Sequence, residues 1–225
     1  MTKIKICGIK SFEAGHAALD AGADYLGFMF YGPSPRSIVP EAAAVLIADL
    51  RARKPTGWEA VGVFVDEPLA SVLATAKHTG LDVIQCSGDE SAEYVRSLPL
   101  PVFKGVRFDA VTGPADSYGA ARLLVDANVA GSYGGTGVTY DWRTVRASVA
   151  EGFLAGGLTP ENVGNAIAIA RPWGVDVSSG VEHSTGHKSP DLIRSFIAAV
   201  RTADTIAEES VSTEALEAHA QGEEP

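Results

Sequence analysis

Residues 3–7 read K-I-K-I-C, an alternation of polar and apolar side chains that predicts a short β-strand. A helix-length stretch separates this run from a second strand-like run, and the arrangement recurs along the chain. The eight runs are KIKIC (3–7), YLGFMF (25–30), AVGVFV (60–65), LDVIQC (81–86), PVFKGV (101–106), RLLVDA (122–127), GFLAGG (152–157) and GVDVSS (174–179). Apolar residues with a period of 3.6 lie between most of them, which is typical of successive βα units.

Eight βα units in about 200 residues predict an α/β fold consisting of a single (β/α)8 TIM barrel over residues 1–202. An open doubly wound sheet would more often stop at about five or six strands. Prolines at the start of helix-length stretches support the division, and the last two of them follow a side-chain cap. They are Pro40, Pro68, Pro160 after Thr159, and Pro190 after Ser189.

The end of the chain, residues 203–225, differs in composition from the rest. It holds seven of the 28 acidic residues, no Lys or Arg and no aromatic residue, so we expect a solvated, disordered acidic tail. The remaining chain has 21 acidic residues against 18 basic ones. It shows no basic patch, which argues against nucleic acid as a partner.

The two cysteines, Cys7 and Cys86, are too few for a disulfide framework and stand in no metal-ligand cluster. The start of the chain lacks the pattern of a secretory signal, and no apolar run reaches the roughly 18 residues of a membrane-spanning helix. We therefore expect a cytoplasmic protein with free thiols, no bound metal and no membrane partner.

Alternation along a parallel strand decides which side chains face the barrel interior. On the first strand Ile4 and Ile6 are expected to face the helices, which turns the polar series inward. The same parity applies to the sixth and eighth strands, where Val175 and Val177 face the helices. The inward-facing side chains are then Lys3, Lys5, Cys7, Leu124, Asp126, Asp176 and Ser178.

Cys7 and Asp126 both end a strand, and barrel enzymes carry their chemistry at the carboxyl ends of the strands. The thiol is a candidate base, although a buried cysteine is often only a small apolar filler. The carboxyl group of Asp126 is a candidate general acid if desolvation raises its pKa, and a loop-capping aspartate is the alternative. Lys5 either stabilises a thiolate or pairs with Asp176. A base and an acid across the mouth suit proton abstraction from a carbon coupled to protonation of an oxygen.

Two loops have the composition of a phosphate site. Ala155–Pro160 follows the seventh strand and Ser178–Glu182 follows the eighth, where barrels often bind phosphate with backbone N–H groups and a short extra helix. Glycine also serves ordinary turns, which is the plainer interpretation. The candidate residues are Gly156, Gly157, Ser178, Ser179 and Gly180.

Two further loops could contact a substrate. Arg36, in Y-G-P-S-P-R-S, could bind a carboxylate with two hydrogen bonds, or it could be a solvated surface arginine. The loop from Gly131 to Gly137 is rich in glycine, which suggests a hinged cover over the mouth or simply a long connection.

Taken together, these segments resemble the phosphoribosylanthranilate isomerase family over almost all of residues 3–200. The motifs are K-I-C-G near the start, G-F-x-F-x-x-x-S-x-R from Gly27 to Arg36, Asp126 with G-G-T-G ending at Gly137, Asp141-Trp142, L-A-G-G-L-x-P-E-N-V and G-V-D-V-S-S-G-V-E. They occur in order and at family-like spacing, and only the tail lies outside the match.

The resemblance implies an isomerase of tryptophan biosynthesis. Its reaction converts N-(5-phosphoribosyl)anthranilate to 1-(o-carboxyphenylamino)-1-deoxyribulose 5-phosphate by an Amadori rearrangement. By motif, Cys7 would be the general base and Asp126 the general acid, with Arg36, Gln85 and Asp176 as substrate-binding residues. The two glycine-rich loops would hold the phosphate of this small phosphorylated substrate. The resemblance implies no metal or organic cofactor. The pattern of the helix faces leaves both a monomer and a homodimer open.

One position departs from the family, which usually reads Q-L-H-G where this chain has Gln85-Cys86-Ser87-Gly88. Ser87 can form hydrogen bonds but cannot carry charge. Cys86 has the parity of a packing residue that faces a helix.

Two other functions compete with this one. The related isomerase of histidine biosynthesis typically has an aspartate where Cys7 stands. A phosphate-binding barrel without catalysis would be expected to lack Cys7 or Asp126, and both are present.

Overall fold

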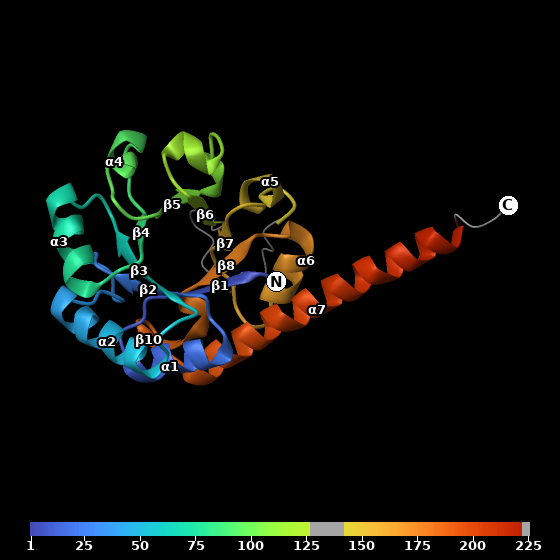
Figure 1. Ribbon diagram of the computed structural model, residues 1–225, viewed down its shortest axis with the longest axis horizontal. Helices are drawn as coiled ribbons and strands as arrows, with labels where there is room; N and C mark the ends of the chain where they lie inside the picture. The colour runs from blue at the N-terminus through green and yellow to red at the C-terminus, as the bar shows by residue number, and fades with distance from the viewer. Residues whose placement is uncertain (127–141, 222–225) are drawn as a thin grey trace.

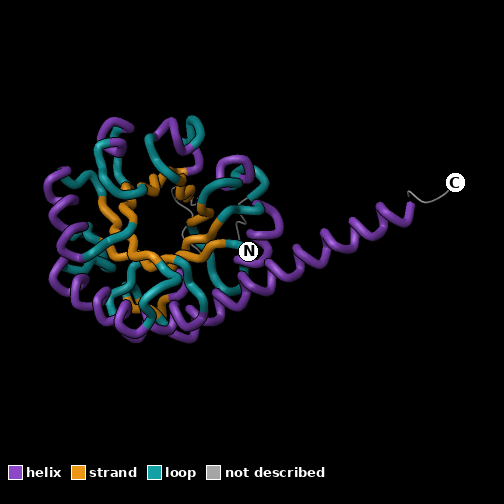
Figure 2. The backbone as a smooth tube through the Cα atoms, in the orientation of Figure 1, coloured by secondary structure: helices purple, strands orange, loops and turns teal. Residues whose placement is uncertain are grey.

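Eight parallel strands form a closed barrel in the computed structural model, which describes residues 1–126 and 142–221, with side chains as far as residue 209. The strands follow one another in chain order and β8 pairs with β1. Figure 2 shows them as a ring inside the helices. They are β1 (Lys3–Cys7), β2 (Tyr25–Met29), β3 (Glu59–Phe64), β4 (Val83–Cys86), β5 (Val102–Arg107), β6 (Arg122–Asp126), β7 (Phe153–Ala155) and β8 (Gly174–Val177). The predicted TIM barrel is confirmed.

Helices surround the barrel (Figure 1). They are α1 (Phe12–Ala21), α2 (Pro40–Arg53), α3 (Leu69–Thr79), α4 (Ala92–Arg96), α5 (Arg146–Val149), α6 (Val163–Ala170) and α7 (Pro190–Gln221). Two short 3-10 helices, η1 (Phe108–Ala110) and η2 (Ala115–Tyr118), lie between β5 and β6. A third, η3 (Ser179–Val181), and a small hairpin of β9 (Glu182–Ser184) and β10 (His187–Lys188) lie between β8 and α7.

The parity predicted from the sequence holds on these strands. Ile4 and Ile6 are fully buried in the apolar layer between strands and helices. The barrel interior holds a separate apolar cluster of Val61, Val83, Phe103, Leu124, Phe153 and Ala155. The rings of Tyr25, Phe103 and Phe153 lie 5.1–5.6 Å apart near the amino ends of their strands. These aromatic rings fill the lower part of the barrel, which leaves the carboxyl ends for polar side chains.

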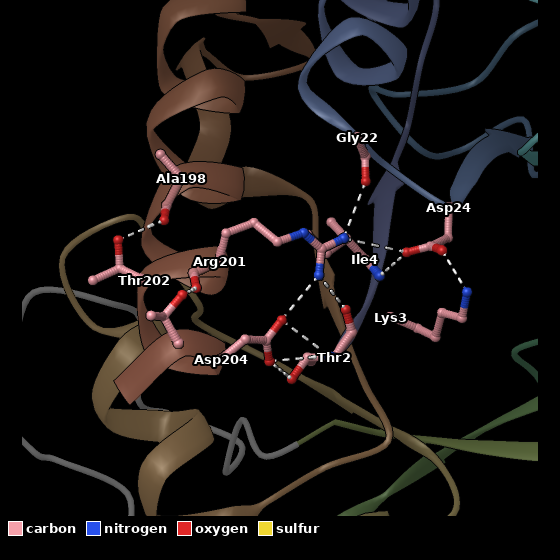
Figure 3. A network of polar contacts seen from close by, with 10 residues as sticks. Thr2, Lys3, Ile4, Gly22, Asp24, Ala198, Arg201, Thr202 and Asp204 are labelled. Carbon is pink, nitrogen blue, oxygen red and sulfur yellow. Dashed lines mark hydrogen bonds and ion pairs between the residues drawn. The ribbon is translucent and has the colours of Figure 1, made fainter. Parts of the chain in front are cut away.

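The first strand is tied to the last helix by a buried polar network (Figure 3). The backbone N–H of Thr2 donates to both carboxylate oxygens of Asp204, at 3.0 and 3.1 Å, and the Thr2 hydroxyl donates to Oδ1 at 2.6 Å. Arg201 donates to the Thr2 carbonyl at 2.7 Å and to Asp204 at 3.0 Å. These bonds fix the start of β1 and therefore help to set the register of Cys7 at its other end.

The sequence predicts a disordered acidic tail over residues 203–225. The structure describes α7 as far as Gln221, and its outer turns project away from the barrel (Figures 1 and 2). The segment is rich in Ala and Glu, which are strong helix formers, and Gly222 is its first helix breaker. Asp204 is buried against Thr2, so the packed part of the chain extends past residue 202.

The expected helix starts agree at Pro40 and Pro190, and α3 begins directly after Pro68, but α6 begins at Val163 rather than at Pro160. Asn162 accepts from the Thr159 N–H at 2.8 Å and donates to the Gly157 carbonyl at 2.9 Å. These bonds hold a turn ahead of the helix. The glycine-rich loop at 131–137, expected as a possible cover, lies outside the described residues.

Candidate active site

A cavity of about 310 Å³ opens at the carboxyl ends of the strands, between β4 and β8. Asp126, at the end of β6, lines it next to its ladder partner Ala155. The predicted residues that line the cavity are Gln85, Asp126, Asp176, Gly156, Gly157, Ser178 and Ser179. Cys7, Arg36 and Gly180 lie at the same end of the barrel but are not part of this lining as the structure describes it.

The Cys7 thiol is 5% exposed and packs against the backbone of β2. A Cβ at Gly27 would lie 2.9 Å from Sγ, so this position has room only for glycine. Burial raises the pKa of the thiol above its usual value. The positive charges of Lys5 and Lys188 oppose the rise, and the charge of Asp176 adds to it. Burial therefore disfavours the thiolate form of Cys7 in the free protein.

Lys5 and Asp176 form a buried ion pair one layer below the thiol. The Lys5 ammonium donates to Asp176 Oδ1 at 2.8 Å, and the lysine side chain is 0% exposed. Burial alone would lower the pKa of Lys5, but the charges of Asp176 and Cys7 raise it overall. The alternative in which Lys5 pairs with Asp176 is confirmed, and stabilisation of a Cys7 thiolate by Lys5 stays a prediction.

The loops after β7 and β8 meet at one point of the rim. Gly156 and Gly157 have φ of 89° and 65°, values that favour glycine. A Cβ at Gly180 would lie 1.9 Å from the Leu158 carbonyl oxygen, so the two loops touch there. The short helix expected next to a phosphate site is present as η3. Among the described residues the Gly157 N–H has no acceptor within the protein, which leaves it available to a ligand.

Arg36 is held by a carboxylate rather than by solvent, so the alternative of a solvated surface arginine is wrong. Its Nε donates to Glu182 Oε1 at 2.7 Å and its Nη2 donates to Oε2 at 2.9 Å. Burial acts to raise the pKa of Glu182, but hydrogen bonds from Arg36 and Lys188 lower it to about 2. Sequence reasoning gave no role to Glu182 or Lys188. The available signal was a polar stretch, E-H-S-T-G-H-K, inserted before the last helix.

Gln85 and Ser87 form a polar pair on the β4 side of the cavity. The Gln85 amide Nε2 donates to the Ser87 hydroxyl at 2.9 Å. Gln85 Oε1 is buried and has no partner among the described residues, although it belongs to a side chain that lines the cavity. Buried polar atoms usually have a partner, so a ligand donor would fit here.

Cys86 faces the helices, as its parity predicts, and belongs to the outer apolar core. Burial raises the pKa of its thiol to about 12. Cys86 is therefore a packing residue.

Comparisons with known proteins agree on one family. A family model described as N-(5'phosphoribosyl)anthranilate (PRA) isomerase matches residues 4–199. An N-(5'-phosphoribosyl)anthranilate isomerase from Geotalea uraniireducens (strain Rf4) is 46% identical over 203 residues, which cover 88% of this chain and 97% of that protein.

Two solved structures extend the comparison to the fold. TrpF from Jonesia denitrificans is similar with a TM-score of 0.81 at 35% identity, covering 91% of this chain and 98% of that chain. A phosphoribosyl anthranilate isomerase in complex with reduced 1-(o-carboxyphenylamino)-1-deoxyribulose 5-phosphate has a TM-score of 0.74 at 33% identity, covering 90% and 100%. None of the helices that the structure describes has the length and apolar character needed to cross a membrane.

Proposed function

The chain belongs to the phosphoribosylanthranilate isomerase family and is an aldose–ketose isomerase of tryptophan biosynthesis, and from this premise we propose how its residues divide the reaction. The reaction is the Amadori rearrangement of N-(5-phosphoribosyl)anthranilate. One observation carries the proposal: the inward-facing thiol of Cys7 and the cavity-lining carboxyl group of Asp126 end two strands at the same mouth of the barrel.

Asp126 is the general acid, which protonates the furanose ring oxygen as the ring opens. The substrate nitrogen then forms an iminium at C1, and this makes the C2 proton acidic. Cys7, as thiolate, is the general base that removes the C2 proton, and the resulting enolamine tautomerises to the ketone. The cations of Lys5 and Lys188 near Cys7 favour the thiolate against the cost of burial.

The rest of the site binds the ends of the substrate. Backbone N–H groups of the loops around Gly156, Gly157 and Ser178 to Gly180 hold the phosphate, and η3 contributes its amino end. Arg36 holds the anthranilate carboxylate through the N–H groups that Glu182 leaves free. Gln85 accepts a hydrogen bond from the substrate through its unpartnered Oε1, and Asp176 holds Lys5 in place beneath the thiol.

The test follows the fluorescence of the anthranilate substrate, which changes as it is consumed. We expect Cys7→Ser and Asp126→Asn each to reduce kcat by at least about 100-fold, since each removes one proton-transfer group. Cys86→Ala is the matched control. It removes the other thiol, which packs against the helices, and should keep the wild-type rate constant.

Two outcomes would contradict the proposal. Full activity of either variant would remove that residue from the chemistry. Binding of the substrate by the wild-type protein without turnover would favour a phosphate-binding barrel. Turnover of the aminoaldose substrate of histidine biosynthesis in the same assay would show a broader range of substrates.

A further inference from the structure

The hairpin of β9 and β10 carries a buried pair of charges, Glu182 and Lys188, and Glu182 takes no part in the proposed proton transfers. The side chains of Glu182 and Lys188 are only 5% and 3% exposed, and Lys188 Nζ lies 2.8 Å from Glu182 Oε1. Removing a carboxylate and an ammonium from water is costly unless each finds several partners. The position of this pair therefore calls for a role beyond surface solubility.

The Glu182 carboxylate accepts hydrogen bonds from the hairpin itself and from the loop between β2 and α2. It accepts two hydrogen bonds from the Arg36 guanidinium, one from Lys188 and one from the Gly186 N–H at 3.1 Å. The double contact with Arg36 is the geometry that best fixes a guanidinium plane. Glu182 thus determines how Arg36 is oriented.

The hairpin also sits firmly against the loop that carries Arg36. A Cβ at Gly186 would lie 2.5 Å from the Pro35 carbonyl oxygen, so the two backbones are in close contact. Lys10 donates to the same carbonyl at 2.9 Å. The loop between β2 and α2 is therefore supported on the side that faces the hairpin.

Lys188 connects the pair to the other parts of the site. Its ammonium donates to the Ser178 carbonyl at 2.8 Å, and the Ser178 hydroxyl donates to the Cys7 carbonyl at 3.3 Å. A continuous chain of polar contacts joins Arg36, Glu182, Lys188, Ser178 and the end of β1. The hairpin therefore contacts the loop that carries Arg36 and the end of β8, and Ser178 extends these contacts to the end of β1.

We propose that Glu182, held by Lys188, is the positioning residue that orients Arg36 to recognise the carboxylate of the substrate. A guanidinium has five N–H donors, and Glu182 occupies two of them, so three on Nη1 and Nη2 remain for a second carboxylate. This inference rests on the proposed role of Arg36 and adds a residue that itself touches no substrate.

The experiment compares the natural substrate with N-(5-phosphoribosyl)aniline, which lacks the carboxylate. Glu182→Gln keeps the size of the side chain but removes its charge, and so weakens its hold on Arg36. We expect the variant to raise KM for the natural substrate by about 10- to 100-fold, the range for a charged hydrogen bond, with little change in kcat. For the aniline substrate its kcat/KM should equal that of the wild type.

A double-mutant cycle separates positioning from a general structural effect. If Glu182 acts through Arg36, the double variant Glu182→Gln/Arg36→Met should be no worse on the natural substrate than Arg36→Met alone. Asp204→Asn serves as the control, because it weakens a buried carboxylate network at the opposite end of the barrel. It should lower the melting temperature without changing KM for either substrate.

Four outcomes would overturn the inference. The first is that Glu182→Gln lowers kcat/KM equally for both substrates, which indicates a structural role. The second is that the two single effects add in the double variant. The third is that Arg36→Met raises KM for the natural substrate alone while Glu182→Gln behaves as wild type. This outcome would leave the proposed function intact. If Arg36→Met does not distinguish the two substrates, the proposed role of Arg36 falls and the inference falls with it.

Discussion

At the scale of single residues, burial and the neighbouring charges act in opposite directions on the pKa of the Cys7 thiol. Burial and the charge of Asp176 favour the neutral thiol, and the charges of Lys5 and Lys188 favour the thiolate. Burial has the largest effect, so the pKa of the Cys7 thiol in the free protein lies above its usual value. A thiol with a raised pKa forms little thiolate in the free protein. The thiolate that does form is more basic than usual, which suits removal of a proton from carbon.

The direction of this shift gives a testable pH dependence. In a Cys86→Ala background, the rate of Cys7 alkylation by iodoacetamide should rise about tenfold per pH unit and should not level off by pH 9, because only the thiolate reacts. Mass spectrometry after timed quenching measures the rate, with glutathione as the free-thiol reference. A plateau below pH 9 would mean that the two lysines outweigh burial.

At the scale of elements, the contact between the β7 and β8 loops leaves no room for a larger residue at one point. Gly180→Ala would place a Cβ 1.9 Å from the Leu158 carbonyl, so one loop must move. We expect the free energy of unfolding to fall by about 1–3 kcal/mol, as for other overpacked sites, and KM to rise because the phosphate loops separate.

Gly164→Ala is the matched control for this substitution. Gly164 lies in α6 with nothing within 4 Å of an added Cβ, and alanine favours helix, so stability should rise by about 0.5–1 kcal/mol with KM unchanged. Urea unfolding and steady-state kinetics measure both quantities. Equal behaviour of the two variants would contradict the proposed contact between the loops and phosphate.

At the scale of the whole molecule, α7 divides into a packed part and a projecting part. Its buried side chains include Ile193, Phe196, Ile197 and Val200, and Asp204 binds Thr2. Truncation after Glu209 should change the free energy of unfolding by less than about 0.5 kcal/mol and leave the kinetic constants unchanged, because the outer turns project away from the barrel (Figure 1).

Truncation after Arg201 is compared with truncation after Glu209, because it also removes part of the packed helix. It removes Asp204 and its hydrogen bonds to Thr2, and should cost about 1–3 kcal/mol. Thermal unfolding monitored by circular dichroism measures both truncations. A large loss after the shorter truncation would show that the projecting turns stabilise the barrel.

The sequence predicts the barrel and the direction of the site residues well, because both follow from local periodicity. The alternation in residues 3–7 is enough to turn Lys5 and Cys7 inward, and the same rule places Asp126 and Asp176. Local patterns also bring the two glycine-rich loops to one rim.

Contacts between distant parts of the chain could not be predicted in this way. Arg36 and Glu182 are 146 positions apart, and their pairing depends on a hairpin whose position only the closed barrel defines. The start of α6 was missed because the Asn162 side chain stabilises a turn that the Thr159-Pro160 signal does not reveal. The boundary of the packed chain at residue 202 was placed too early because the contact of Asp204 with Thr2 joins residues 202 positions apart.

The network of Thr2, Arg201 and Asp204 indicates that the chain could be circularly permuted. Since it brings the opening and the closing segments of the barrel into direct contact, a short peptide joining them would let a circularly permuted polypeptide start elsewhere. New ends cut at the exposed turn around Gly57, on the face remote from the substrate mouth, would preserve every strand pairing and the reaction centre.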